Sequence, residues 1–285
     1  AHRTAHDLHQ LGVEIAAVID SRPEAPASDS FEVLAASEVM NTHGRMGLNS
    51  IDVKTPQGLR QIKVSALGVS GGWNPNIHLT CHQRGRPEWD ATLSAFVPSA
   101  GLPKALHVAG AANGQMTTAA AIQDAVTSAM KITEDYGRKP ISLAIPKTSD
   151  ESASITPFWY VTGTERGWVD QQNDVTVKDI KLAHQENFRS VEHLKRYTTL
   201  GMATDQGKTS NVLGLAIMAH TAGQSIPDTG TTIYRPPYSP TAIGVLAGRS
   251  RDMDFRPIRK TPSHKWAEEQ GAVFVEVGMW YRAQW

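Results

Sequence analysis

A short run of small residues near the middle of the chain has the composition of a nucleotide-binding turn. The run GAANG, residues 110–114, follows an apolar segment, residues 106–109, and precedes an alanine-rich segment, residues 116–133. A strand, a turn of small residues and a helix bring backbone N–H groups close to a phosphate. The alternative is that small residues here only let a helix pack closely on a strand. The residues expected to contact the nucleotide are Gly110, Ala111, Asn113 and Gly114.

Two other places extend this candidate site. Gly72 and Trp73 stand on a turn after the apolar run 66–70, which we expect to neighbour the first turn. Asp20 ends the apolar run 13–19, where an acidic residue in a dinucleotide-binding βαβ unit bonds a ribose hydroxyl. The helix expected before this run does not follow a glycine-rich turn, so a role for Asp20 in a turn or cap is the alternative.

Three further patterns have a simpler explanation than catalysis or binding. Residues 68–72 match the G-x-S-x-G pattern of serine hydrolases, but the following glycines and the Asn74-Pro75 step favour an extended turn over the helix that a nucleophile elbow needs. His2, His6 and His9 have a spacing that could hold a metal, and a solvated helix face is the alternative. The basic strip 249–260 could accept an acidic partner or a polyanionic ligand, and a charged surface or interface strip is the alternative.

Composition excludes several classes of protein. The chain has 285 residues, 28 Lys and Arg against 28 Asp and Glu, and thus no basic excess for binding nucleic acid. Cys81 is the single cysteine, so an intrachain disulfide and a four-cysteine metal site are impossible, and a reducing cytoplasm is the expected location. No run reaches the 18 apolar residues of a membrane span. We expect neither nucleic acid nor membrane as a partner.

Hydrophobic periodicity and capping residues predict the elements that must position these side chains. Three prolines in residues 139–165 indicate a linker and a domain boundary. Thr176 and Ser190 are candidate helix N-caps. We expect helices over residues 4–11, 116–133, 176–186, 190–198 and 210–220 and after Pro262, and strands over 13–19, 47–54, 59–64, 66–70, 106–109 and 272–277.

Several long runs of the sequence together resemble one family, the alpha subunits of heterotetrameric sarcosine oxidases. The resemblance extends over essentially the whole chain. Its clearest parts are residues 18–23, 69–79, 96–98, 108–114, 173–176, 190–208 and 232–237.

This resemblance implies an α/β fold in three parts. Residues 1–165 resemble part of a two-dinucleotide-binding domain of the flavoprotein disulfide-reductase type, and residues 166–258 resemble a small helical [2Fe-2S]-binding domain without its cysteines. Residues 259–285 resemble the start of an aminomethyltransferase fold that binds tetrahydrofolate. The chain is thus expected to be an internal piece of a longer subunit.

The resemblance also implies the cofactors. In the flavoprotein motif Gly-Asp, the acidic residue contacts the flavin, but Ala111 follows Gly110 here, so NAD is expected instead of FAD. The cysteines of C-x-C and C-x4-C are matched by Asp170, Gln172, Asp205 and Ser210. Those side chains cannot replace four thiolates on iron, so no iron–sulfur cluster is expected.

For function, the resemblance implies a complex that oxidatively demethylates sarcosine to glycine with oxygen and tetrahydrofolate. FAD and FMN belong to that complex, amine oxidation takes place with the beta subunit, and beta, gamma and delta subunits are the expected partners. This chain is expected to bind nucleotide and act as a scaffold, with no catalytic residue and no metal. The alternatives are the alpha subunit of a related amine, opine or N-methyl amino acid dehydrogenase, and a non-catalytic module that binds subunits.

Overall fold

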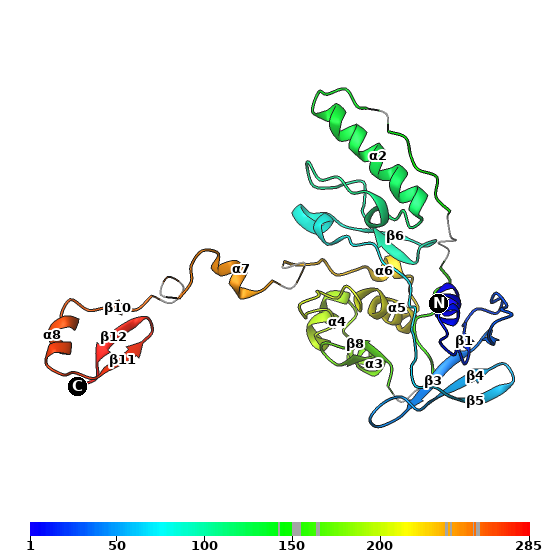
Figure 1. Ribbon diagram of the computed structural model, residues 1–285, viewed down its shortest axis with the longest axis horizontal. Coiled ribbons are helices and arrows are strands. Elements are labelled where there is room, and N and C mark those ends of the chain that lie inside the picture. The colour runs from blue at the N-terminus through cyan, green and yellow to red at the C-terminus, as the bar shows by residue number, and fades with distance from the viewer. Residues whose placement is uncertain are drawn as a thin grey trace. The chain divides into compact units, whose positions relative to one another are not determined.

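The computed structural model describes the chain except residues 142, 150–154, 164, 165, 237, 238, 240, 253, 255 and 256, and except the side chains of residues 82 and 83. Contacts divide it into two units, Ala1–Tyr238 and Ser239–Trp285 (Figure 1). The boundary predicted after residue 165 lies outside the described residues, and the three-domain division stays a prediction. Among the described helices, none has the length and apolar character needed to cross a bilayer.

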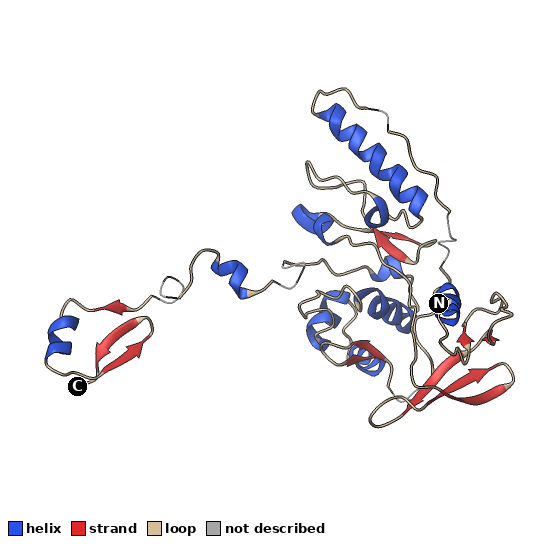
Figure 2. Cartoon of the chain, in the orientation of Figure 1, coloured by secondary structure: helices blue, strands red, loops and turns tan. Residues whose placement is uncertain are grey.

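The first elements build a small sheet region (Figure 2). Helix α1 (His2–Gln10) leads to β1 (Val18–Ile19), which pairs in parallel with β2 (Val33–Leu34). Strands β3 (Glu38–His43), β4 (Ser50–Thr55) and β5 (Gly58–Lys63) form an antiparallel meander. Ile51, Val53 and Ile62 point to one face and make its core, as the period of two requires. Of the strand predicted over residues 13–19, only the last two residues form a strand.

The middle segment differs from the expected strand–turn–helix unit. It contains the 3₁₀ segment η1 (His78–Arg84), the hairpin of β6 (Glu88–Asp90) and β7 (Ala95–Val97), the 3₁₀ turn η2 (Gly110–Asn113), and α2 (Thr118–Asp135). The strands predicted over 66–70 and 106–109 were wrong, since neither run pairs with another strand in the described part of the chain. Apolar composition does not make a strand without a partner for its backbone groups.

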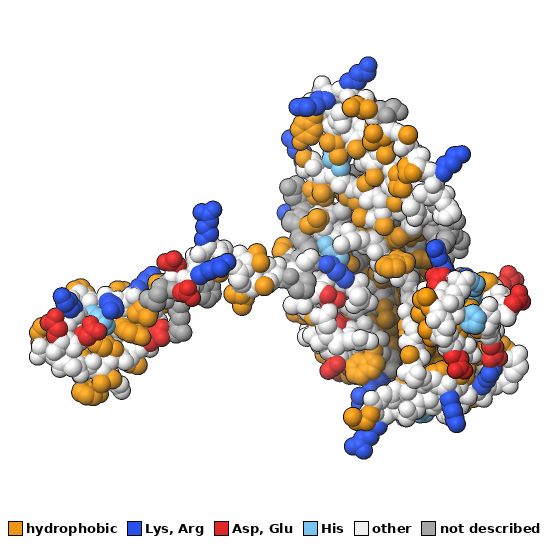
Figure 3. Space-filling view, viewed as in Figure 1, with side chains coloured by type: hydrophobic (Ala, Val, Ile, Leu, Met, Phe, Trp, Pro, Cys, Tyr) orange, Lys and Arg blue, Asp and Glu red, His pale blue; other side chains and the backbone are white. Residues whose placement is uncertain are grey.

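Helix α2 is confirmed within two residues of its predicted bounds, yet it packs little. Thr117 caps it by accepting the Ala120 N–H. None of the helix residues is buried, and Figure 3 shows hydrophobic side chains gathered over this part of the surface. Tertiary packing of α2 is thus mostly with the η2 turn.

The main core lies in a helical segment that begins with a two-stranded hairpin. Strands β8 (Trp168–Asp170) and β9 (Val175–Thr176) precede α3 (Val177–Gln185), α4 (Val191–Thr198), α5 (Asn211–Ala222) and α6 (Ile226–Thr229). Thr176 and Asp179 form a capping box, and Ser190 caps α4, as predicted. Ile180, Leu194 and Ile217 are almost fully buried together. The three predicted helices are confirmed.

The second unit has its own elements. They are α7 (Ile243–Ala247), β10 (Arg259–Lys260), α8 (His264–Glu269), β11 (Phe274–Val277) and β12 (Trp280–Ala283), with strand order β10-β12-β11. The predicted helix after Pro262 and the strand ending at Val277 are confirmed. The buried ring of His264 lies against Phe274, with 4.1 Å between ring centroids.

Candidate functional site

The structure brings Gly110, Ala111, Asn113 and Gly114 together on the η2 turn and its C-terminal end. A carboxylate from α2 holds this turn. Asp124 Oδ2 accepts the Gly110 N–H at 2.8 Å and the Asn113 side-chain amide at 3.2 Å. Asp124 therefore occupies two of the donors that the sequence assigned to a pyrophosphate.

The two glycines of the turn face protein atoms. Gly110 has φ +69°, and a Cβ built there would lie 3.7 Å from the Ala121 Cβ. Gly114 has φ +80°, and its Cβ would lie 3.0 Å from Val97 and 3.2 Å from Leu93. At Gly114 the missing side chain therefore allows close packing, the alternative that the sequence left open, whereas Gly110 is favoured by its positive φ. Nucleotide binding at the turn stays a prediction.

Asp20 is part of a local ion-pair group. Its carboxylate accepts bonds from the Arg22 backbone N–H at 2.9 Å and guanidinium at 2.6 Å, and lies 2.8 Å from His2 Nε2. The hydrogen bonds from Arg22 hold the pKa of Asp20 well below its usual range. These contacts favour the turn role over the ribose contact. They also engage one of the three histidines with metal-like spacing.

The remaining sequence patterns do not assemble into sites. Among the described residues, no group of three or more His, Cys, Asp or Glu could hold a metal ion. Ser70 lies in a segment without regular secondary structure, and no helix follows it directly. Arg256 of the basic strip lies outside the described residues. Gly72 and Trp73 belong to the same irregular segment as Ser70, and Trp73 is 83% exposed.

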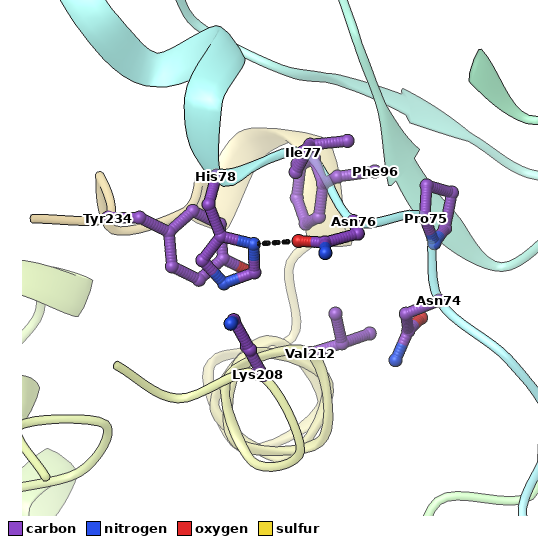
Figure 4. A pocket seen from close by; sticks show the side chains of 9 residues that line it. All are labelled: Asn74, Pro75, Asn76, Ile77, His78, Phe96, Lys208, Val212 and Tyr234. Atoms are coloured by element: carbon purple, nitrogen blue, oxygen red, sulfur yellow. Dashed lines mark hydrogen bonds between the residues drawn. The ribbon is translucent and has the colours of Figure 1, made fainter. Parts of the chain in front are cut away.

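Immediately after Trp73, the chain enters the wall of a cavity of about 230 Å³ (Figure 4). Four parts of the first unit surround it: the segment before and at the start of η1, strand β7, the residues around the start of α5, and Tyr234 after α6. Its lining residues are Asn74, Pro75, Asn76, Ile77, His78, Phe96, Lys208, Val212 and Tyr234.

His78 is the most buried polar residue of this cavity, with 4% exposed. Its Nδ1 lies 2.5 Å from Asn76 Oδ1, so the ring nitrogen donates to the amide oxygen. The Tyr234 ring lies over the imidazole, with centroids 3.9 Å apart and planes tilted by 40°. Burial, with the charge of Lys208 second, lowers the pKa of His78 to about 4, so the ring is neutral at pH 7. Burial also raises the pKa of Tyr234 to about 12.

The four positions matched to cluster-binding cysteines lie in two loops that contact each other. Asp170 is 3% exposed, and its Oδ2 accepts the Gly201 N–H at 2.8 Å, while Oδ1 accepts the Gln172 N–H at 2.9 Å. Asp205 Oδ1 accepts the Gly207 N–H at 3.1 Å. Ser210 is buried at the start of α5. The carboxylates therefore act as acceptors for backbone N–H groups.

Sequence reasoning missed Asp124 and the cavity residues His78, Lys208 and Tyr234. Asp124 gave no signal because it lies 14 positions from the N–H that it accepts. The cavity side chains come from four separate segments, so spacing along the chain cannot reveal them. The buried run around Ile77, with a histidine beside it, was the single local hint.

Relatives of the chain share its sequence over most of its length. The family model described as the sarcosine oxidase A3 domain matches residues 164–249. Sarcosine oxidase subunit alpha of Rhizobium meliloti (strain 1021) is 40% identical over 286 residues, covering 99% of this chain and 29% of that protein. The protein of the same name from Corynebacterium sp. (strain P-1) is 38% identical over 236 residues, covering 79% of this chain and 24% of that protein. The chain spans less than a third of the length of these relatives.

One solved structure shares the fold at low sequence identity. The crystal structure of L-proline dehydrogenase from P. horikoshii matches with a TM-score of 0.60 and 16% identity, covering 81% of this chain and 50% of that one. The fold of the chain is therefore an established one. By its sequence matches over nearly its whole length, the chain belongs to the sarcosine oxidase alpha-subunit family, with the A3 domain at residues 164–249.

Proposed function

We propose that the chain works as part of the alpha subunit of a sarcosine oxidase. The reaction is the oxidative demethylation of sarcosine to glycine, with oxygen reduced to hydrogen peroxide and tetrahydrofolate converted to 5,10-methylenetetrahydrofolate. The observation that carries this proposal is the 40% identity to a sarcosine oxidase alpha subunit over 99% of the chain.

Within that complex, the proposed role of this chain is nucleotide binding and scaffolding. NAD is the proposed nucleotide, bound near the η2 turn, where Asp124 fixes the conformation of Gly110 and Asn113. FAD and FMN would supply the electron-accepting chemistry, with amine oxidation at the beta subunit. Partners would be the beta, gamma and delta subunits. The helical domain would then contribute surfaces for assembly.

The loops matched to a [2Fe-2S] site do not fit a cluster. Their side chains are two carboxylates, an amide and a hydroxyl, and both oxygens of Asp170 already accept backbone N–H groups. Iron–sulfur clusters are held by cysteine thiolates. We therefore assign no electron-transfer step to these loops.

Capture of the chain from its source cells tests the assembly. After gentle lysis, native mass spectrometry should report three different partner chains together with the masses of NAD and flavins. The same preparation should produce hydrogen peroxide on addition of sarcosine. Turnover of proline or another amine without peroxide would show that the complex is a related dehydrogenase and not the oxidase. A preparation with no partner, nucleotide or activity would favour the third hypothesis, a non-catalytic binding module.

Titration of the 285-residue chain with NAD⁺ in a calorimeter tests the nucleotide site. Gly110→Val should abolish binding, because a branched side chain at φ +69° would displace the turn. Gly68→Val is the matched control, since Gly68 has no atom within 4 Å of a built Cβ and no positive φ. Circular dichroism should show that both variants are folded. Equal NAD⁺ binding by both variants would show that the turn is not part of the nucleotide site.

A further inference from the structure

We propose that the cavity between η1, β7 and the start of α5 is a binding site for a small planar anion, an aromatic or heteroaromatic carboxylate. Nothing in the proposed NAD site accounts for this cavity, which lies after Trp73 and is lined by residues from four segments (Figure 4).

The charge of the lining favours an anion. Of the nine lining residues, Lys208 is the one cation and none is acidic. The Lys208 charge is close enough to lower the pKa of His78, whereas Asp205, which does not line the cavity, acts in the opposite direction. An ammonium has three N–H donors, so it can bond a ligand carboxylate and a protein group together. A cationic ring such as that of NAD⁺ is disfavoured here.

The walls favour a flat ligand with a polar edge. The rings of His78 and Tyr234, in contact at a tilt of 40°, form one aromatic surface, and Phe96 adds a further aromatic side chain. Since Asn76 Oδ1 accepts from the His78 ring, its amide group retains two N–H donors. Asn74 adds a second carboxamide to the lining. Aromatic walls with few placed polar groups are typical of small-molecule sites.

The size limits the ligand to about one ring. The cavity volume of about 230 Å³ is below the roughly 300–1,000 Å³ of pockets for drug-sized ligands. A whole dinucleotide is therefore too large. A ring with one carboxylate is the smallest ligand that uses the aromatic walls, the amides and the ammonium at once.

Nicotinate and nicotinamide are matched probes, because they have the same ring and nearly the same shape but differ in charge. Saturation-transfer NMR on the 285-residue chain should give nicotinate at least about tenfold tighter binding than nicotinamide, since hydrogen bonds between charged groups are roughly twice as strong as neutral ones. Lys208→Met should abolish this preference, and Lys208→Arg should keep it. Lys131→Met, at an exposed position of α2, is the control and should bind like the unchanged chain.

Each other outcome overturns the proposal. Equal affinity for the two probes in the unchanged chain shows that the cavity does not select an anion, and this comparison needs no variant. A preference that survives in folded Lys208→Met places the anion elsewhere. In a competition experiment, equally effective displacement of nicotinate by inorganic phosphate and by benzoate would show an anion site that does not select for a ring.

Discussion

The carboxylate of Asp170 ties two loops of the A3 domain together, so its charge should be essential to stability. Asp170 is 3% exposed, and it accepts N–H groups of Gly201 at 2.8 Å, Gln172 at 2.9 Å and Asn173 at 3.3 Å. Asp170→Asn keeps the size of the side chain but turns one acceptor oxygen into an NH₂ donor. Either the Gly201 bond or the bonds within the hairpin must then be lost.

The expected cost follows from these bonds. A hydrogen bond to a charged group contributes about 1.5–3 kcal/mol, and a buried donor left without an acceptor costs about 1–3 kcal/mol. We therefore expect Asp170→Asn to lower the free energy of unfolding of the first unit by about 3 kcal/mol. Asp174→Asn makes the same change in the same hairpin at an exposed position with φ +53°, where asparagine is well tolerated. Its effect should stay within about 0.5 kcal/mol.

Urea unfolding followed by tryptophan fluorescence measures both variants, and Trp168 on β8 reports on this hairpin. Amide hydrogen exchange adds a local measurement at Gly201. In Asp170→Asn, the Gly201 amide should exchange faster by the factor that corresponds to the lost free energy. A midpoint equal to that of Asp174→Asn, or unchanged protection of Gly201, would refute the assignment of Asp170 as the tie between the loops.

Two further predictions concern ionisation and capping. The pKa of His78 is about 4 in the folded chain and 6.5 in the unfolded chain, so the unfolded state binds the proton first as the pH falls. The free energy of unfolding should therefore decrease between pH 6.5 and 4 by about 1.4 kcal/mol per pH unit, which is about 3 kcal/mol in all. Urea titrations at several pH values check this, and His78→Gln should flatten the dependence. Thr176→Ala should cost about 1 kcal/mol by removing the cap of α3, whereas Thr127→Ala at an exposed helix position should cost much less in the same assay.

Local chemistry predicted the helices better than the strands. Thr176 and Ser190 satisfy N–H groups within three residues of themselves, so the sequence alone predicts these helix starts. The runs 66–70 and 106–109 have strand-like composition, but a strand also needs a neighbour, and pairing is a long-range property. For the same reason, the contact from Asp124 to Gly110 and the cavity around His78 could not be predicted from spacing.

The contacts of Asp170 also explain how the helical domain can keep its fold at positions matched to cysteines. A cluster held by the two loops would tie them through metal bonds, which contribute directly to folding. Here the tie is made by hydrogen bonds, from Gly201 N–H to Asp170 and from the Thr204 hydroxyl to Gln172 at 3.4 Å. Ser210 makes no such contribution, since its buried Oγ has no hydrogen-bond partner among the described residues. The four matched positions are therefore unequal: the loops depend most on Asp170, and Ser210 is the position whose polar atom could be removed at least cost.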